Sequence, residues 1–258
     1  MSVDLNLVKQ LRQQTGVGMM ECKEALEETS GDLDKALEVL RKKGAVKAAK
    51  KADREAKEGL IEVAAADDHK KVALVQVQCE TDFVAKNEVF SGFVKELAAK
   101  AFEGNDAEQE FEKQKDELVL KIGENLIFSK AELIEGEYVS SYLHANHKLA
   151  GVAAFNKELP DELAHDIAMQ VAASGPLYVK PEDVPKEVQE KEKEIYREQL
   201  KGEGKPAEIV EKILLGKINK YYEEVCLLKQ PFVKEDKKRV EQLLPEGVEI
   251  IGFVRYSL

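Results

Sequence analysis

The sequence predicts an α+β fold with a helical amino-terminal module, a core that is built twice and an inserted helical hairpin. Three observations support this class. Apolar residues recur at spacings of three and four over residues 5–40, as on one face of a helix. Residues 59–102 and 136–173 each combine strand-like runs with one helical pattern, which favours antiparallel sheets covered by helices. Residues 184–225 contain two highly charged helical patterns with a break between them.

Composition narrows the functional classes. The chain has 258 residues, enough for one large domain or two to three smaller ones. Its hydrophobic content of 43% suffices for packed cores, and its charged content of 34% suggests extended, solvated helical surface. Its net charge of −11 argues against a general nucleic-acid binder and against adhesion to anionic membranes. It contains no apolar run of about 18 residues, and its first residues lack a secretion or transit pattern.

The three cysteines, Cys22, Cys79 and Cys226, are odd in number and far apart in the sequence. This usage is typical of reduced thiols. Together with the absence of a targeting pattern, it predicts a cytoplasmic protein.

Residues 1–44 are expected to form a compact module of three short helices that is similar to ubiquitin-associated (UBA) domains. The breaks between the helices are indicated by Gly16 with Gly18 and by Ser30-Gly31-Asp32, and Gly44 is expected to end the third helix. Met19 and Met20 lie at the glycine turn, where such modules often contact partners. Because thioether side chains also fill cores, we expect one of the two to be buried.

Residues 45–58 are expected to form a helical linker. They are rich in Ala, Lys and Arg and show no apolar face. No aromatic residue is interleaved with the basic ones, and the rest of the chain is acidic. A solvated helical tether is therefore favoured over a nucleic-acid-binding stripe.

A duplicated core is predicted from two matching segments, residues 59–135 as one half and residues 136–180 with 229–258 as the other. Each half contains a strand, a His-Lys turn and a second strand, followed by a helix. The turns His69-Lys70 and His147-Lys148 are offset by 78 positions (147 minus 69, and 148 minus 70). The segment 127–134 is expected to add a strand to the first half.

An inserted helical hairpin is predicted over residues 181–228, with helices at 184–200 and 207–225. This hairpin could pair with a second copy of the chain and so form a homodimer. The chain is then expected to return through a helix over 234–244. A strand over 248–256 would complete the second sheet.

An acid–aromatic pair, Asp82-Phe83, lies where a predicted strand gives way to a predicted helix. Thr81 is expected to be the N-cap of that helix, its hydroxyl accepting from an amide of the first turn. On shape alone, the favoured interpretation is that Phe83 packs on the helix while Asp82 interacts with the helix dipole.

The sequence of this stretch is more specific than its shape. Thr81–Asn87, Thr-Asp-Phe-Val-Ala-Lys-Asn, resembles the signature of the elongation factor Ts family, the nucleotide exchange factors of elongation factor Tu in bacteria and organelles. Residues 7–26, continuing through 31–33 and 44–52, resemble the amino-terminal module of the same family. A weaker resemblance extends to residues 230–233.

The resemblance implies that elongation factor Tu, in its GDP-bound and nucleotide-free forms, is the partner. Phe83 would insert between helices of the partner's G domain, and Asp82 would displace the Mg²⁺ that the partner holds. Thr81 and Val84 would brace the turn. Loss of Mg²⁺ would leave the phosphates of GDP without charge compensation and so speed their release.

Further partner contacts implied by the resemblance are Met19 and Met20 in the module and His144 near the second hairpin. The family commonly continues into one more helix that touches the partner, a contact that we expect to be missing from a sequence that stops at Leu258. Neither a cofactor nor a resident metal is implied.

Catalytic motifs are not evident in the sequence. There is no Walker-type loop and no Gly-x-Gly-x-x-Gly fingerprint after a strand. His144 and His147 lack a third ligand at suitable spacing and are interpreted as turn residues. Cys79 has no basic neighbour and is expected to be a buried strand-end residue. We therefore expect a protein without covalent chemistry.

Two alternatives differ in class. One is an adaptor that binds through the UBA-like module without exchange activity, for which the acid–aromatic pair would have no use. The other, a weaker one, is a metal-dependent hydrolase built on His144, His147 and acidic residues.

Overall fold

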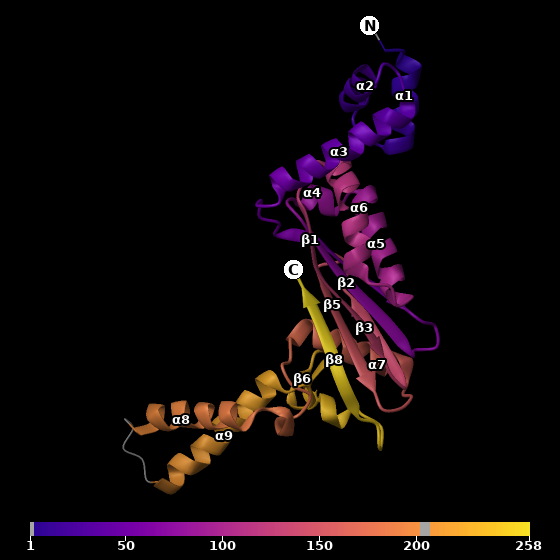
Figure 1. Ribbon diagram of the computed structural model, residues 1–258. Helices are drawn as coiled ribbons and strands as arrows, with labels where there is room; N and C mark the ends of the chain where they lie inside the picture. Colours follow the sequence, from indigo (N-terminus) through magenta and orange to yellow (C-terminus); the bar gives the residue numbers. More distant parts are fainter. Residues whose placement is uncertain (1–2, 202–206) are drawn as a thin grey trace. The chain divides into compact units, whose positions relative to one another are not determined.

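The computed structural model describes residues 3–201 and 207–258, which divide into two compact units (Figure 1). Unit 1 comprises the residues up to Ala64, Ala73–Leu133 and Leu258, and unit 2 comprises Ala65–Val72 and Ile134–Ser257. Helices and small sheets are combined within each unit. The predicted α+β class is therefore confirmed.

Unit 1 begins with three helices, α1 (Leu5–Thr15), α2 (Met19–Glu28) and α3 (Leu33–Lys51). Asp4 and Asp32 cap α1 and α3 by accepting hydrogen bonds from nearby backbone amides, as aspartate does at helix N-termini. Gly16 ends α1 in a left-handed conformation, with φ of 68°. The buried core of the module is formed by Val8, Leu11, Val17, Cys22, Ala25, Leu26, Ala36 and Leu40, together with Leu120 from α6.

The third helix does not end at Gly44, and that prediction was wrong. Helix α3 continues to Lys51 and packs along α6 (Ala107–Ile122). A Cβ at position 44 would lie 2.7 Å from the carbonyl oxygen of Asp116, so the absence of a side chain permits this close approach. Glycine is a packing residue here rather than a helix stop.

The segment 45–58 is correspondingly not a solvated tether. Ala48 is buried, and it belongs to the main core of unit 1. The Lys51 ammonium donates to the carbonyl of Gly123, just beyond α6. The segment is helical as far as Lys51, but the prediction of a solvated tether was wrong, because alanine, which sequence patterns score as weakly apolar, is enough to pack a helix closely against its neighbour.

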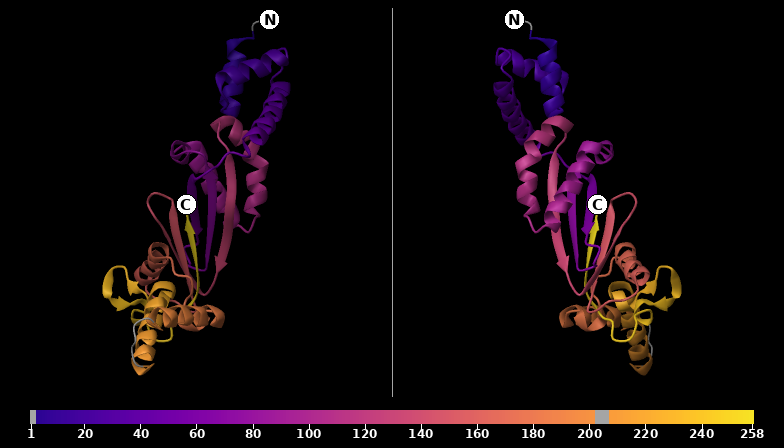
Figure 2. Two further views of the ribbon diagram at one scale, coloured as in Figure 1. Left: turned by 90° about the vertical axis from the view of Figure 1, so that its left-hand side faces the viewer. Right: turned by 90° about the vertical axis from the view of Figure 1, so that its right-hand side faces the viewer.

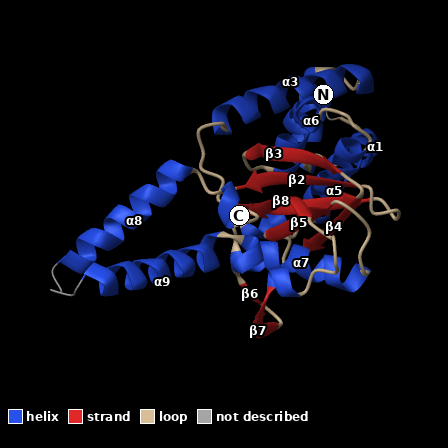
Figure 3. Cartoon of the chain, turned by 90° about the horizontal axis from the view of Figure 1, so that it is seen from below, coloured by secondary structure: helices blue, strands red, loops and turns tan. Residues whose placement is uncertain are grey.

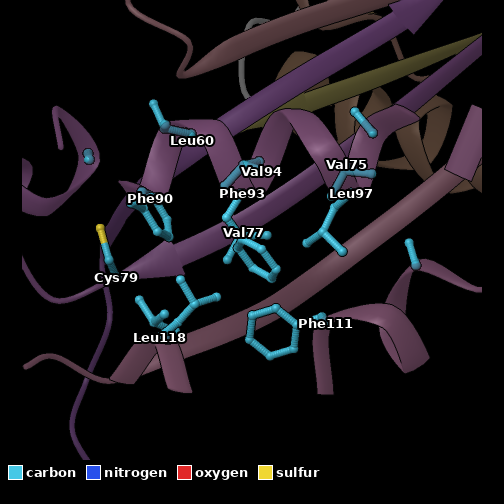
Figure 4. Close-up of a cluster of buried hydrophobic side chains, with 14 of the residues drawn as sticks. Leu60, Val75, Val77, Cys79, Phe90, Phe93, Val94, Leu97, Phe111 and Leu118 are labelled. Carbon is cyan, nitrogen blue, oxygen red and sulfur yellow. The ribbon is translucent and has the colours of Figure 1, made fainter. Parts of the chain in front are cut away.

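The first sheet has the order β1–β2–β3, with β1 at Glu58–Ala65, β2 at Lys71–Cys79 and β3 at Leu126–Glu135. Helices α4 (Asp82–Ala85) and α5 (Glu88–Phe102) follow β2, and α5 and α6 cover the sheet (Figure 2). Alternate residues of β2 point into this core, as the period of a strand requires (Figure 4). They are Ala73, Val75, Val77 and Cys79.

The second sheet, in unit 2, has the order β4–β5–β8. Strand β4 (Tyr138–Leu143) pairs antiparallel with β5 (Leu149–Phe155), and β5 pairs antiparallel with β8 (Ile250–Ser257). The predicted final strand is thus present. Helix α7 (Asp161–Ser174) packs on β4 and β5, and a Cβ at Gly151 would lie 2.3 Å from the Ala168 carbonyl.

The two His-Lys turns have the same local geometry. His69 and His147 both adopt the left-handed conformation, with φ of 57° and 54°. In the first turn Asp68 Oδ1 accepts from the backbone amide of Lys70, and in the second Asn146 Oδ1 accepts from the amide of Lys148, each at 3.0 Å. The offset of 78 positions therefore joins equivalent turns, which supports an internal repeat.

The inserted helices are α8 (Lys186–Lys201) and α9 (Ala207–Val225), which lie side by side (Figure 3). Most of the break predicted between them, residues 202–206, lies outside the described residues. At the base of the pair, the Tyr222 hydroxyl donates to Gln189 Oε1 at 2.9 Å. Single turns of 3-10 helix flank the pair, η1 at Pro181–Asp183 and η2 at Leu227–Lys229.

The predicted helix over 234–244 is wrong. Strand β6 (Pro231–Phe232) pairs antiparallel with β7 (Glu235–Arg239), and a 3-10 turn, η3 (Val240–Gln242), follows. The five residues of β7 are all charged and exposed, so they offer no apolar stripe that could hold a helix on the core. Phe232 and Val240 are buried and anchor the two ends of this small ribbon.

Candidate functional site

The acid–aromatic pair lies on a short turn of helix between β2 and α5. Thr81 is its N-cap, as predicted, and its hydroxyl oxygen accepts from the amide of Val84 at 3.4 Å. The helix is only four residues long, because Asn87 caps a second helix by accepting from Val89 and Phe90. The sequence predicted one continuous helix, whereas the structure has two, α4 and α5.

Phe83 points away from the core, with 81% of its surface exposed, so the interpretation that it packs on the helix is wrong. The next two residues, Val84 and Ala85, are buried in the core of unit 1 and take over the anchoring role. Burying a phenylalanine side chain is worth about 1.5–3 kcal/mol, and this turn forgoes that gain. Such an exposed aromatic residue, on an otherwise packed turn, is available to a partner.

Asp82 lies beside Phe83 and has about half of its side chain exposed. Its Oδ2 accepts from the Lys86 ammonium at 2.7 Å, one helical turn further on. This hydrogen bond, with the negative charge of Asp82, raises the pKa of Lys86. An exposed pair of this kind contributes little to stability.

Glu124, in the loop between α6 and β3, holds the turn from behind. Its Oε1 accepts from the Thr81 hydroxyl at 2.6 Å, and its Oε2 accepts from the Thr81 amide at 3.0 Å. One carboxylate thus takes both hydrogen-bond donors of the N-cap residue.

Glu80, on the other side, holds the loop that carries Glu124. Its Oε1 accepts from the backbone amide of Asn125 at 2.6 Å, and its Oε2 faces Arg54 Nη1 at 3.5 Å. The Asn125 side chain in turn donates to the carbonyl of Arg54 at 2.8 Å. The turn and the loop are therefore joined by two carboxylates, each accepting from the segment that carries the other.

Cys79 lies two residues before Thr81 and is fully buried at the end of β2, as predicted. Its thiol donates to the carbonyl of Thr81 at 3.2 Å. Burial, and to a lesser extent the charge of Glu124, raises the pKa of Cys79 to about 12. The thiol is therefore neutral and structural rather than nucleophilic.

The predicted contact residues outside the turn are all on the surface. Met19 and Met20, in the first turn of α2, are 42% and 64% exposed, so the expectation that one of them is buried was wrong. His144 is exposed after β4, in unit 2, with its ring 6.2 Å from that of Tyr142. The structure thus brings together Thr81, Asp82, Phe83 and Val84.

His144 and His147 belong to the tight turn between β4 and β5. The His147 amide donates to the His144 carbonyl at 2.8 Å, as in a β-turn. Within the described residues, no group of three or more His, Cys, Asp or Glu side chains is placed to hold a metal ion. In the same part of the chain, no helix is long and apolar enough to cross a membrane.

Sequence reasoning missed the residues that support the turn: Arg54, Glu80, Glu124 and Asn125. Glu124 is 43 positions from Thr81, so local spacing cannot connect the two. A signal was nevertheless present, because Gly123 ends α6 in a left-handed conformation and is followed at once by two polar residues.

The fold and the turn define an α+β protein that presents an acid–aromatic pair from a rigidly held turn. A sequence model of the family described as Elongation factor TS matches residues 80–258, a stretch that includes the whole turn.

Three curated relatives, each named Elongation factor Ts, match almost the full chain. The protein from Chlorobaculum parvum is 46% identical over 278 aligned positions, covering 97% of this chain and 96% of the relative. The Teredinibacter turnerae protein is 45% identical, covering 100% and 91%. The Aquifex aeolicus protein is 44% identical, covering 100% and 98%. The chain therefore belongs to the elongation factor Ts family.

Proposed function

We propose that this chain acts in the cytoplasm, during translation elongation, as a guanine-nucleotide exchange factor for elongation factor Tu. The observation that carries the proposal is the exposure of Phe83, next to Asp82, on a turn whose remaining residues are buried or hydrogen-bonded. Family membership supports the same conclusion.

The proposed mechanism requires no covalent step and no catalytic residue. An exchange factor binds the nucleotide-free partner more tightly than the nucleotide-bound partner, and linkage then requires that factor and nucleotide weaken each other equally. Phe83 acts as an apolar wedge that separates packed helices of the G domain. Asp82 brings a carboxylate towards the Mg²⁺ of the partner, and loss of that ion leaves the phosphates of GDP without charge compensation.

Binding energy is proposed to come from a broader surface as well. Met19 and Met20 are exposed together in the first turn of α2, and thioether side chains adapt to the shape of a partner. His144 supplies a further contact from unit 2. In interfaces of this type a few residues carry most of the energy, so the wedge and the methionines are the first candidates for substitution.

Release of a fluorescent GDP analogue from elongation factor Tu tests the function directly. Addition of this protein, at a tenth of the partner's concentration, should accelerate release, because an exchange factor is regenerated at each cycle. An adaptor that binds through its helical module alone would form a complex yet leave release unchanged. Overlapping release traces at saturating protein, with binding demonstrated, would therefore favour the adaptor.

A further inference from the structure

The turn that carries Phe83 is too short to be stable by itself. A helix of four residues contains less hydrogen bonding than its nucleation costs, so α4 must be held in shape by its surroundings. Val84 and Ala85 anchor one side of it in the core. The other side, at the N-cap residue Thr81, is anchored by Glu124, which is 43 positions away in the sequence.

We propose that Glu124 is a positioning residue for nucleotide exchange, which fixes the N-cap of α4 and thereby the direction in which Asp82 and Phe83 project. This inference rests on the proposed function of the turn. Glu124 acts through Thr81, whose hydroxyl and backbone amide both donate to its carboxylate.

The chemistry of the hydroxyl explains why a carboxylate is needed. A threonine hydroxyl has one proton and two lone pairs. Because the proton is donated to Glu124 Oε1 at 2.6 Å, a lone pair is left to accept the amide of Val84, the third residue of the helix, whose amide an N-cap side chain commonly satisfies. A hydrogen bond to a charged acceptor is roughly twice as strong as a neutral one and fixes the hydroxyl rotamer.

The position of Glu124 is itself fixed from both sides. Gly123, with φ of 83°, closes α6 by donating to the Val119 carbonyl, and so sets the direction of the loop. Asn125, on the other side of Glu124, donates its amide to Glu80, which directly precedes Thr81. With the two carboxylates crossing between the segments, the turn cannot shift without breaking at least two charge-assisted hydrogen bonds.

The test compares Glu124→Ala and Glu124→Gln with the control Glu112→Ala. Glu112 is an exposed carboxylate on α6 that faces Lys115 at 3.5 Å, so its loss changes the charge equally without touching the turn. Two measurements are made on each purified protein. They are amide hydrogen exchange at Val84, Ala85 and Lys86, and GDP release from elongation factor Tu at saturating and sub-saturating factor.

In Glu124→Ala, hydrogen exchange at these three amides should become at least about tenfold faster, as expected for loss of a hydrogen bond to a charged group. The amides of Phe93 to Leu97, in the middle of α5, should keep their protection. The maximal rate of GDP release should fall by roughly tenfold or more, with Glu124→Gln intermediate because its amide keeps one acceptor. The control should match the parent protein in both measurements.

Unchanged protection of the three amides in Glu124→Ala would overturn the proposal. So would normal GDP release by Glu124→Ala if Phe83→Ala is slow in the same assay. If both variants release GDP normally, the proposed function of the turn has failed, and with it the positioning role that rests on it.

Should Glu124→Ala unfold α5 as well, Thr81→Val serves instead, because it removes only the hydroxyl from a partly exposed site. It should loosen the same amides and slow the maximal rate of GDP release, whereas Thr81→Ser should restore both. Failure of serine to restore them would overturn the proposal.

Discussion

Two phenylalanines, Phe83 and Phe90, lie seven positions apart and have opposite surroundings. Phe83 is 81% exposed, whereas Phe90 is fully buried in the core of unit 1. Phe83→Ala should change the free energy of unfolding by no more than about 0.5 kcal/mol, the usual range for a surface site. Phe90→Ala should cost about 3–5 kcal/mol through loss of burial and a new cavity.

The two substitutions should affect exchange activity in the opposite order to stability. Per folded molecule, Phe83→Ala should release GDP from elongation factor Tu more slowly than the parent, and Phe90→Ala should retain the parental rate. Chemical denaturation and release kinetics on the same preparations give both quantities. A core-sized loss of stability in Phe83→Ala, with normal release, would show that its exposure has no role in exchange.

Cys79 makes stability depend on pH above the physiological range. Its pKa is 9.0 in an unfolded chain and about 12 in the folded protein, where burial disfavours the thiolate. Between these values the unfolded chain has lost a proton that the folded chain keeps, so the contribution is complete below pH 9 and declines as the pH rises towards 12.

Comparison of the parent with Cys79→Ala isolates this contribution. The difference in unfolding free energy between the two proteins should be constant from pH 7 to about pH 8.5 and should change, to the disadvantage of the parent, at about pH 10. Urea denaturation at the three pH values measures it. A difference that is independent of pH would mean that the thiolate is tolerated in the folded state.

At the scale of secondary-structure elements, two glycines inside helices predict opposite effects of the same substitution. Gly44→Ala places a Cβ 2.7 Å from the Asp116 carbonyl oxygen, so α3 and α6 must separate, at a cost of about 1–3 kcal/mol. Gly92→Ala, within α5, meets no atom within 4 Å and should stabilise by about 0.5–1 kcal/mol.

Both variants belong to unit 1, so thermal unfolding of the same unit reports on each. A stabilising effect of Gly44→Ala would contradict the close packing of the two helices. The pair also controls for the general preference of alanine over glycine in helices, which acts equally at both positions.

Periodicity was sufficient to predict the elements whose apolar residues face one core. The strand β8 and the helices α8 and α9 lie within a few residues of their predicted positions, and β2, α5 and α7 follow the predicted order of strand, His-Lys turn, second strand and helix. Prediction failed where tertiary contacts override a local signal. In the sequence Gly44 indicates the end of a helix, whereas in the structure it allows close packing against the Asp116 backbone. The charged residues of β7 have no apolar pattern of their own and are held by buried residues at either end of the ribbon.

The site was predictable only in part, for the same reason. Thr81, Asp82 and Phe83 could be selected from one short stretch, and the capping role of Thr81 followed from its position before the helix. The exposure of Phe83 did not follow, because an aromatic residue at the start of a helix packs inwards in many proteins. Glu124 escaped notice because its partner is 43 positions away.

At the scale of the whole molecule, the two core halves use the same position for different purposes. The first half follows its second strand with the turn that carries Phe83. In the second half Asn156 occupies that place, and it accepts from the Glu249 amide at 2.8 Å and donates to the Gly247 carbonyl at 3.2 Å. The first half thus leaves Phe83 exposed at this strand end, and the second half uses the equivalent place to hold its own final strand.

The inserted hairpin should be removable without loss of the rest of unit 2. Replacement of residues 190–221 by about six Gly and Ser residues keeps Gln189 and Tyr222, whose side chains meet at the base. Among the described residues, the core of unit 2 includes side chains from β4, α7 and β8 but none from α8 or α9. The free energy of unfolding of that core should therefore change by no more than about 1 kcal/mol.

The same deletion tests whether two copies of the chain pair through the hairpin, as the sequence allows. Ile195, Ile209 and Leu215 are exposed on α8 and α9, and all three would be removed. If the hairpins pair, light scattering should report a dimer for the intact chain and a monomer for the shortened one. The same number of chains per particle in both proteins would exclude the hairpin as the interface. Loss of hydrogen-exchange protection at the β5 amides would show that the hairpin is part of the core.

Because α3 is continuous, it holds the amino-terminal module at a fixed distance from the turn that carries Phe83. The helix spans 19 residues, or roughly 28 Å, and its contacts at Gly44 and Lys51 fasten it along α6. Helix α6 ends two residues before Glu124, which holds the turn with Phe83. The exposed side chains of Met19 and Met20 and that of Phe83 are therefore held at a fixed separation. Under the proposed function, a G protein with every matching residue, but with one extra helical turn between its two docking points, would contact one of these two surfaces and miss the other.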